Sequence, residues 1–170
     1  MSAGAAGARA AWADLVREAA QARGPSGDAR VRGQRFVLFR IDGAPYALAV
    51  ERVREIVRLR PVTPVPRLPE AVIGVFSLRG QVLQLLDLRR RMGLPAAAAP
   101  RARIVVAHDA DGRVAGLLVD AVEEVAAVAE GEFCAAPTGA PGLVAGLFRR
   151  GGRFVSIVDL DRVMDVDAGR

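Results

Sequence analysis

The sequence of 170 residues contains no lysine, one cysteine and one histidine. Without lysine, the chain cannot build a Walker-type phosphate loop, a Schiff base or a serine–lysine catalytic pair. The single cysteine, Cys134, excludes an internal disulfide and any metal site made of several cysteines. His108 stands alone at the end of a strand-like segment, and none of the four serines lies in a nucleophile elbow. We therefore expect a binding protein that is not an enzyme and needs no cofactor or metal.

The sequence also lacks a long apolar run. Apolar residues make up 52% of the chain, which is enough for a core, but no stretch approaches the roughly 18 uncharged residues of a membrane span. The Ala-rich start carries Arg9, Asp14 and Arg17 where a signal peptide would need apolar residues. These features predict a cytoplasmic protein that does not insert directly into a membrane.

All 24 basic residues are arginine, and the net charge is +5. A GC-rich genome that encodes Arg in place of Lys is the simpler interpretation. The alternative is a surface that binds a polyanion. Many arginines stand near Asp or Glu in the sequence, and few aromatic residues are available to stack on bases, so the pattern disfavours nucleic acid. Glu123 and Glu124 are interpreted as solvated charges.

Two blocks of the sequence occur twice. Residues 46–56 match residues 115–125 at an offset of 69, and residues 74–92 match residues 146–164 at an offset of 72. The identical pairs of the first block are Leu48/Leu117, Val50/Val119, Val53/Val122 and Glu55/Glu124. A repeat in the same order indicates two copies of one small fold. Each copy has about 60 residues and would be marginal alone, so we expect the two copies to pack against each other.

Each copy is predicted to consist of short strands joined by tight turns. The expected strands are 34–41, 44–50, 71–78 and 81–86, then 103–108, 113–119, 144–149 and 153–158. Asp87 and Asp159 are expected to cap short helices, and helical turns are expected at 51–56 and from Asp120. Residues 130–143 look irregular. We expect each copy to form a small five-stranded barrel, at about 34–93 and 101–166.

Residues 1–30 stand outside the repeat. Apolar residues at helical spacing predict one amphipathic helix, and the segment 24–27 then forms a flexible joint. The helix is either an appendage that packs loosely on a neighbouring surface or a docking helix that buries Trp12 against a partner. The chain is thus divided into a helical extension and linker at 1–30 and a repeated domain at 31–168.

Three positions of the repeated domain need an explanation. Gly116 interrupts a strand, which usually marks a close approach of another group to the backbone. Arg79 stands in a turn, and the equivalent position of the second copy is Gly151. A structural role common to both copies is therefore not expected for Arg79, and we favour a specific function. Glu55 is a candidate for a charge pair with Arg79.

Several separated blocks of the sequence resemble the CheW-like coupling proteins of bacterial chemotaxis. The blocks are residues 46–56, 61–66, 73–89 and 114–122, and the resemblance covers about 34–166. It implies an all-β fold of two SH3-like five-stranded barrels packed together, with short helices and here an extra N-terminal amphipathic helix. It also implies an adaptor that joins the cytoplasmic tip of a methyl-accepting chemoreceptor to the regulatory domain of a CheA-type histidine kinase, located in the cytoplasm and recruited to receptor arrays.

The resemblance also implies two sets of binding residues. Those that face the kinase map to Glu55, Ile56, Ile73 and Gly74. Those that face the receptor, in a groove between the barrels, map to Val53, Arg79, Gly116 and Val122. Two alternatives stay open: an adaptor of the same fold in a motility or developmental pathway, and, more remotely, a basic small-barrel module that binds nucleic acid.

Overall fold

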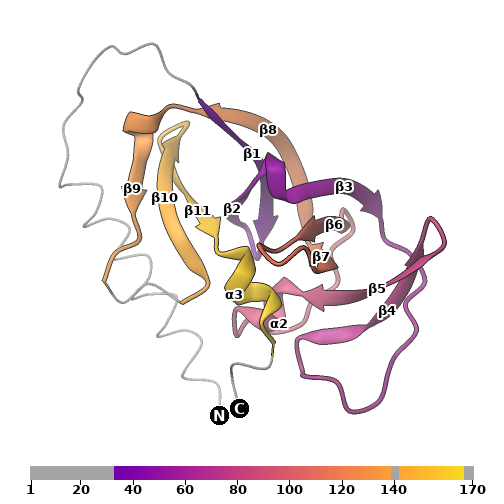
Figure 1. The fold of residues 1–170 in the computed structure, drawn as a ribbon. Coiled ribbons are helices and arrows are strands. Elements are labelled where there is room, and N and C mark those ends of the chain that lie inside the picture. Colours follow the sequence, from indigo (N-terminus) through magenta and orange to yellow (C-terminus); the bar gives the residue numbers. More distant parts are fainter. Residues whose placement is uncertain (1–32, 139–141, 167–170) are drawn as a thin grey trace.

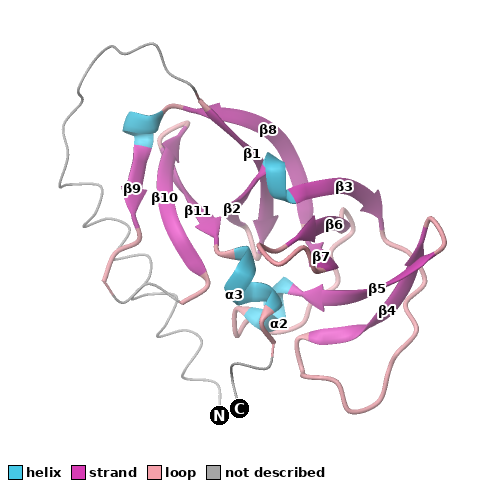
Figure 2. Ribbon diagram, viewed as in Figure 1, coloured by secondary structure: helices cyan, strands magenta, loops and turns pink. Residues whose placement is uncertain are grey.

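A computed structural model describes residues 33–138 and 142–166 (Figure 1). The helix expected within residues 1–30 lies outside the described residues. The elements are β1 (Gln34–Ile41), β2 (Ala44–Ala49), η1 (Val50–Arg52), β3 (Val53–Arg58), β4 (Val72–Leu78), β5 (Gln81–Asp87), α2 (Leu88–Arg91), β6 (Arg103–His108), β7 (Val114–Val119), β8 (Ala121–Val128), η2 (Glu130–Glu132), β9 (Phe133–Ala135), β10 (Val144–Arg150), β11 (Arg153–Val158) and α3 (Leu160–Met164). Strands dominate, and the helical segments are short (Figure 2).

The strands form two mixed sheets that lie side by side. The six-stranded sheet has the order β8-β1-β2-β11-β10-β9, and the five-stranded sheet has the order β3-β6-β7-β5-β4. Most neighbours are antiparallel, but β11 pairs with β2 and β5 pairs with β7 in parallel. The two parallel pairs are equivalent in the repeat, so the sheets are built by the same rule.

The sheets do not follow the halves of the sequence, and this corrects the expected barrels at 34–93 and 101–166. The chain leaves the six-stranded sheet after β2, forms β3 to β7 in the five-stranded sheet, and returns with β8. β3 therefore pairs with β6, and β8 pairs with β1. The two copies therefore exchange strands. The result is an interlocked pair of sheets.

The expected helical turns at 51–56 and from Asp120 are largely strand. η1 covers only Val50–Arg52, and β3 and β8 begin at Val53 and Ala121. β3 alternates between half-buried and exposed residues and is rich in β-branched side chains, which favours a strand once a neighbour is available. The segment 130–143, expected to be irregular, contains η2 and β9.

The tight turns and helix caps agree with the sequence. Asp42-Gly43 and Arg79-Gly80 both have positive φ at two consecutive residues, as a type I′ hairpin turn requires. The Asp87 carboxylate accepts hydrogen bonds from the backbone N–H groups of Arg89 and Arg90, at 2.9 and 3.4 Å. Asp159 caps α3 in the same way.

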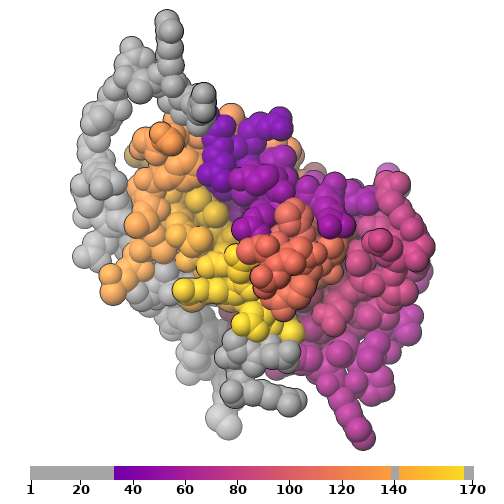
Figure 3. Space-filling view, viewed as in Figure 1, coloured from indigo at the N-terminus to yellow at the C-terminus, as the bar shows by residue number. Residues whose placement is uncertain are grey.

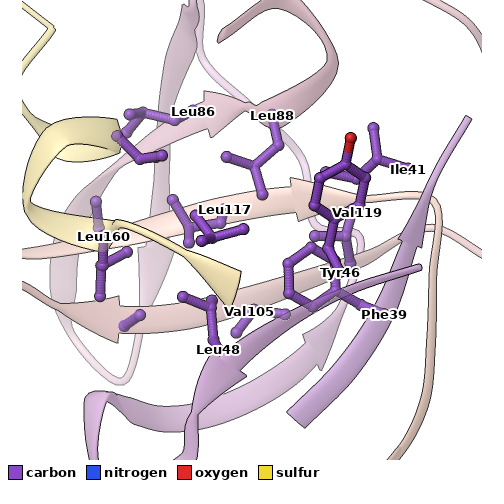
Figure 4. Packing of buried hydrophobic residues seen from close by; sticks show 14 of the residues in the cluster. Phe39, Ile41, Tyr46, Leu48, Leu86, Leu88, Val105, Leu117, Val119 and Leu160 are labelled. Carbon is purple, nitrogen blue, oxygen red and sulfur yellow. The ribbon is translucent and has the colours of Figure 1, made fainter. Parts of the chain in front are cut away.

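Buried side chains form three clusters. One lies within the six-stranded sheet around Phe36 and Phe148, and a second lies within the five-stranded sheet around Phe76 and Ile104. The largest lies between the sheets and takes residues from both sheets and both α-helices (Figure 4). Its labelled members are Phe39, Ile41, Tyr46, Leu48, Leu86, Leu88, Val105, Leu117, Val119 and Leu160. The shared cluster shows why one copy alone could not bury its apolar surface.

On the face shown in space-filling view, the β6–β7 hairpin and α3 occupy the middle, between strands of the two sheets (Figure 3). Both elements supply residues to the shared cluster. The joint between the sheets is therefore a packed interface, and side chains at its margin are held by both sheets.

Candidate partner-binding surfaces

Glu55 and Arg79 form an ion pair across the five-stranded sheet. Glu55 lies on β3 and Arg79 lies in the turn between β4 and β5; β3 and β4 are the two edge strands of this sheet. Arg79 Nε donates to Glu55 Oε1 at 2.9 Å, and Nη2 donates to Oε2 at 3.2 Å. This bidentate geometry fixes both side chains. The hydrogen bond from Arg79 holds the pKa of Glu55 below its ordinary value. The charge pair expected from the sequence is thus present.

The six-stranded sheet contains a matching ion pair. Arg150 Nε donates to Glu124 Oε1 at 2.9 Å, and Nη2 donates to Oε2 at 3.1 Å. Glu124 is the repeat equivalent of Glu55, whereas Arg150 stands one residue before Gly151, the equivalent of Arg79. The expectation that Arg79 has no structural counterpart is therefore wrong. Comparison of single positions missed Arg150, because the arginine moved one residue along the turn while its guanidinium kept the same partner.

Glu123 and Glu124 are exposed, as expected, and each also has an arginine partner. Arg40 on β1 forms an ion pair with Glu123, and Arg150 holds Glu124. Both carboxylates lie near the start of β8, so the ion pairs connect this edge strand to β1 and to the end of β10.

A cavity of about 200 Å³ opens beside the Glu55–Arg79 pair. Its lining combines charged residues with apolar ones: Arg54, Glu55, Leu78, Arg79, Gln81, Leu83, Val106 and Val114. Leu78 and Val106 belong to the interior cluster of the five-stranded sheet. The cavity is therefore partly apolar and is bordered by the ion pair.

The four residues mapped to the kinase are placed in two environments. Glu55 and Ile56 lie on the edge strand β3, where Ile56 is 39% exposed. Ile73 is half-buried and packs against the interior of the five-stranded sheet. Gly74 is buried: its φ is +147°, and a Cβ there would lie 2.4 Å from the carbonyl oxygen of Thr63. The absence of a side chain at Gly74 thus allows the proline-rich segment around Thr63 to pair with β4.

The four residues mapped to the receptor are similarly divided. Arg79 is on the surface, with 78% of its side chain exposed. Val53 and Val122, which are repeat equivalents, are half-buried against the cluster between the sheets. Gly116 is buried in β7, and a Cβ there would lie 2.6 Å from Phe76 Cε1 and 2.7 Å from Ile104 Cγ2. The close approach expected at Gly116 is confirmed, and it comes from side chains of the core.

A network that the sequence did not reveal fastens the joint between the sheets. Asp120, between β7 and β8, accepts hydrogen bonds from Arg89 Nη2 at 2.6 Å, from Arg89 Nε at 2.8 Å and from the Asp42 backbone N–H at 2.7 Å. Burial alone would raise the pKa of Asp120, but the hydrogen bonds from Arg89 and Asp42 outweigh it and hold the pKa below its ordinary value. The sequence signal that could have indicated this network is the run of three arginines, 89–91. Arg91 also contributes across the joint, since its guanidinium donates a hydrogen bond to the carbonyl oxygen of Val163.

The equivalent position of the other sheet carries a reversed arrangement. Asp161 on α3 is the repeat equivalent of Arg89, and it accepts a hydrogen bond from the backbone N–H of Ala110 at 2.7 Å and lies 3.5 Å from Arg52 Nη1. In each copy a side chain of the short helix thus reaches the opposite sheet. This side chain is the cation Arg89 in the first copy and the anion Asp161 in the second.

Two further observations concern the described residues. They contain no group of three or more His, Cys, Asp or Glu side chains that could hold a metal ion. No helix in the same part of the chain has the length and apolar character to span a membrane.

Comparisons with known proteins agree with this arrangement. Residues 35–168 match the model of the CheW-like domain. The chemotaxis protein CheW of Rhizobium meliloti (strain 1021) is 33% identical over 135 residues, which cover 77% of this chain and 87% of the relative. CheW of Bacillus subtilis (strain 168) is 29% identical over 143 residues, covering 81% and 91%. Protein FrzA of Myxococcus xanthus is 37% identical over 90 residues, covering 52% and 56%.

The fold is shared with a solved scaffolding protein. The crystal structure of the scaffolding protein TtCheW from Thermoanaerobacter tengcongensis superposes with a TM-score of 0.73 at 27% identity, covering 78% of this chain and 93% of that one. The two interlocked sheets thus define a non-catalytic scaffold of the chemotaxis type. The chain belongs to the CheW-like family.

Proposed function

We propose that this protein couples chemoreceptors to a CheA-type histidine kinase. In this proposal each sheet folds as a small SH3-like barrel, and the scaffold holds the cytoplasmic tip of the receptor and the regulatory domain of the kinase together. The protein acts in the cytoplasm and joins receptor arrays through its partners. The observation that carries the proposal is the Glu55–Arg79 ion pair beside an open cavity and the exposed Ile56, at the edge where the family resemblance places partner contacts.

The adaptor needs no chemistry of its own. A receptor that changes shape alters the kinase only if the assembled complex has different free energies in the two receptor states. Arg79 and Ile56 supply an exposed charged group and an exposed apolar group, and such anchors carry most of the energy of modest interfaces. In this view Val53 and Val122 contribute to the packing between the sheets. Gly74 and Gly116 allow the close contacts inside the five-stranded sheet that a side chain would prevent.

The direct test is formation of a three-component complex. Purified full-length protein is mixed with the regulatory domain of the kinase and a soluble cytoplasmic fragment of the receptor, and the complexes are separated by size-exclusion chromatography. We expect one complex that contains all three proteins. Binding of neither protein, or strictly exclusive binding of one, would overturn the proposal.

A second candidate is the same adaptor in a pathway that controls a motility or developmental output. The 37% identity with Protein FrzA, a relative whose name does not include chemotaxis, is the observation that favours it. Binding measurements with kinases and receptors from each candidate pathway separate the two, since the cognate pair binds more tightly.

A further inference from the structure

The two sheets carry net charges of opposite sign. Residues 50–119, which form the five-stranded sheet with its loops and α2, contain twelve arginines and six carboxylate side chains, a net charge of +6. Residues 33–49 and 120–166, which form the six-stranded sheet with α3, contain six arginines and nine carboxylates, a net charge of −3. The molecule is therefore polarised, although its overall charge is modest.

Three of these arginines lie in one stripe that begins on the edge strand β3. Arg54, Ile56 and Arg58 alternate along the exposed face of the strand, and Leu59 and Arg60 follow directly. We call these five residues the β3 stripe. Ile56 is 39% exposed and Leu59 is 55% exposed, so two aliphatic side chains lie among three guanidinium groups.

The three arginines of the β3 stripe lack a carboxylate partner within the part of the chain that the structure describes. Four arginines elsewhere do have one: Arg79, Arg89, Arg113 and Arg150 each lie within 3.0 Å of a carboxylate oxygen. Arg60 lies near enough to Glu55 to help lower the pKa of that carboxyl, but it forms no ion pair with it. The stripe thus presents charge that the fold itself does not neutralise.

The repeat shows that this charge is not required by the fold. At the offset of 69 residues, Arg54 corresponds to Glu123, Ile56 to Val125 and Arg58 to Ala127 on the edge strand β8. Val125 is 55% exposed, so the exposed aliphatic residue is kept in both copies. Arg54 is replaced by an acidic residue, and Arg58 is replaced by an uncharged one. The two edge strands therefore share an exposed aliphatic residue and differ in the charge beside it.

We infer that the β3 stripe binds an acidic protein surface that carries exposed aliphatic side chains, and that the edge strand β8, which carries no arginine and whose two glutamates are paired, does not attract the same surface. The inference rests on the proposed function, in which the regulatory domain of the kinase is the partner at β3. Placing a carboxylate-rich surface against three unpaired guanidinium groups accelerates association and fixes orientation. The two similar edges thereby select different partners.

A protein surface fits the stripe better than a nucleic acid. Ile56 and Leu59 occupy its middle, and aliphatic side chains contribute little to contacts with phosphates. The structure describes Phe and Tyr side chains only in buried or half-buried positions, so none is exposed for stacking on bases.

The test compares two triple variants of equal charge in the full-length protein. Arg54→Gln, Arg58→Gln and Arg60→Gln together neutralise the β3 stripe. Arg101→Gln, Arg149→Gln and Arg153→Gln remove the same charge from exposed positions elsewhere. Binding to the purified regulatory domain of the kinase is measured by titration calorimetry at several salt concentrations, and circular dichroism and thermal unfolding check the fold of each variant.

We expect the stripe variant to bind the kinase domain at least about tenfold more weakly at low salt, with a smaller dependence on salt, while the control variant stays close to wild type. Equal affinity and equal salt dependence for the stripe variant and wild type would overturn the inference and leave the proposed function intact. Failure of the wild type to bind the kinase domain at any salt concentration would overturn both. A stripe variant that loses affinity for a single-stranded RNA probe, but not for the kinase domain, would assign the stripe to nucleic acid instead.

Discussion

Arg89, at the start of α2, reaches out of the five-stranded sheet and holds Asp120 where the chain enters the six-stranded sheet. Arg89 Nε donates to Asp120 Oδ1 at 2.8 Å, and Arg89 Nη2 donates to Asp120 Oδ2 at 2.6 Å. The two side chains are only 12% and 17% exposed. Asp120 also binds the backbone at Asp42 in the β1–β2 turn. One carboxylate therefore connects a helix, a turn and the crossing point of the chain, and it sets how the two sheets meet.

The Arg89–Asp120 contact should contribute measurably to stability. Arg89→Leu removes the guanidinium and leaves the Asp120 carboxylate mostly buried without its strongest partner. We expect a loss of about 2 kcal/mol in the free energy of unfolding, between the values for surface and deeply buried pairs. Urea unfolding followed by circular dichroism measures it. Arg149→Leu, at an exposed position, serves as the control, and a loss of the same size in both variants would contradict the assignment.

The low pKa of Asp120 predicts how this stability depends on pH. The pKa of Asp120 is lower in the folded chain than in the unfolded chain. Ionised Asp120 therefore contributes its full stabilisation at pH values above the unfolded pKa of about 3.9, and this contribution is lost as the pH falls through the folded pKa. The difference in unfolding free energy between wild type and Asp120→Asn should thus be constant near neutral pH and shrink below about pH 4. Urea titrations across this range test it, and a difference that grows on acidification would refute it.

Gly116 should tolerate no side chain. In Gly116→Ala the new Cβ would lie 2.6–2.8 Å from Phe76 and Ile104, so core side chains must shift, at an expected cost of about 2 kcal/mol. Gly131→Ala is the matched control, since a Cβ there meets nothing within 4 Å. Thermal unfolding compares the two. If Gly116→Ala bound the receptor more weakly without any loss of stability, Gly116 would instead be assigned to the receptor-binding surface.

Arg79 should matter for binding more than for folding. Its side chain is 78% exposed, and exposed ion pairs contribute little to stability. We expect Arg79→Ala to keep the unfolding midpoint of wild type while its affinity for the receptor fragment falls by about tenfold or more, as for an interface anchor. A pull-down or calorimetric titration in which Arg79→Ala binds like wild type would exclude this role.

A double-mutant cycle tests whether Glu55 and Arg79 bind partners as a unit. Affinity for the receptor fragment is measured for Glu55→Gln, Arg79→Gln and the double variant. Since the bidentate contact fixes both side chains, the effects of the two single variants should not add. The same cycle on Glu124 and Arg150 is the internal control, because that pair has the same geometry on the other sheet. Additive effects in the first cycle would show that the two residues act separately.

Much of this protein was accessible from its sequence. The repeat, the strand positions, the type I′ turns and the Asp87 and Asp159 caps depend on neighbours within a few residues, and the pattern of apolar residues records them. The resemblance to CheW-like proteins and the lack of catalytic groups also followed from the chain alone. The pair between Glu55 and Arg79 could be suggested because each residue stood out locally.

Which strand lies beside which was decided only by the tertiary structure. A strand of the first copy can pair with an equivalent strand of either copy, so local patterns cannot show that β3 joins β6 or that β8 joins β1. The same applies to Arg150, to Arg89 with Asp120, and to the unpaired arginines of the β3 stripe, since each depends on residues distant in sequence. Side-chain pattern determined the elements and the family, whereas long-range packing of the shared core determined the exchange of strands, the joint and the charge left exposed at each edge.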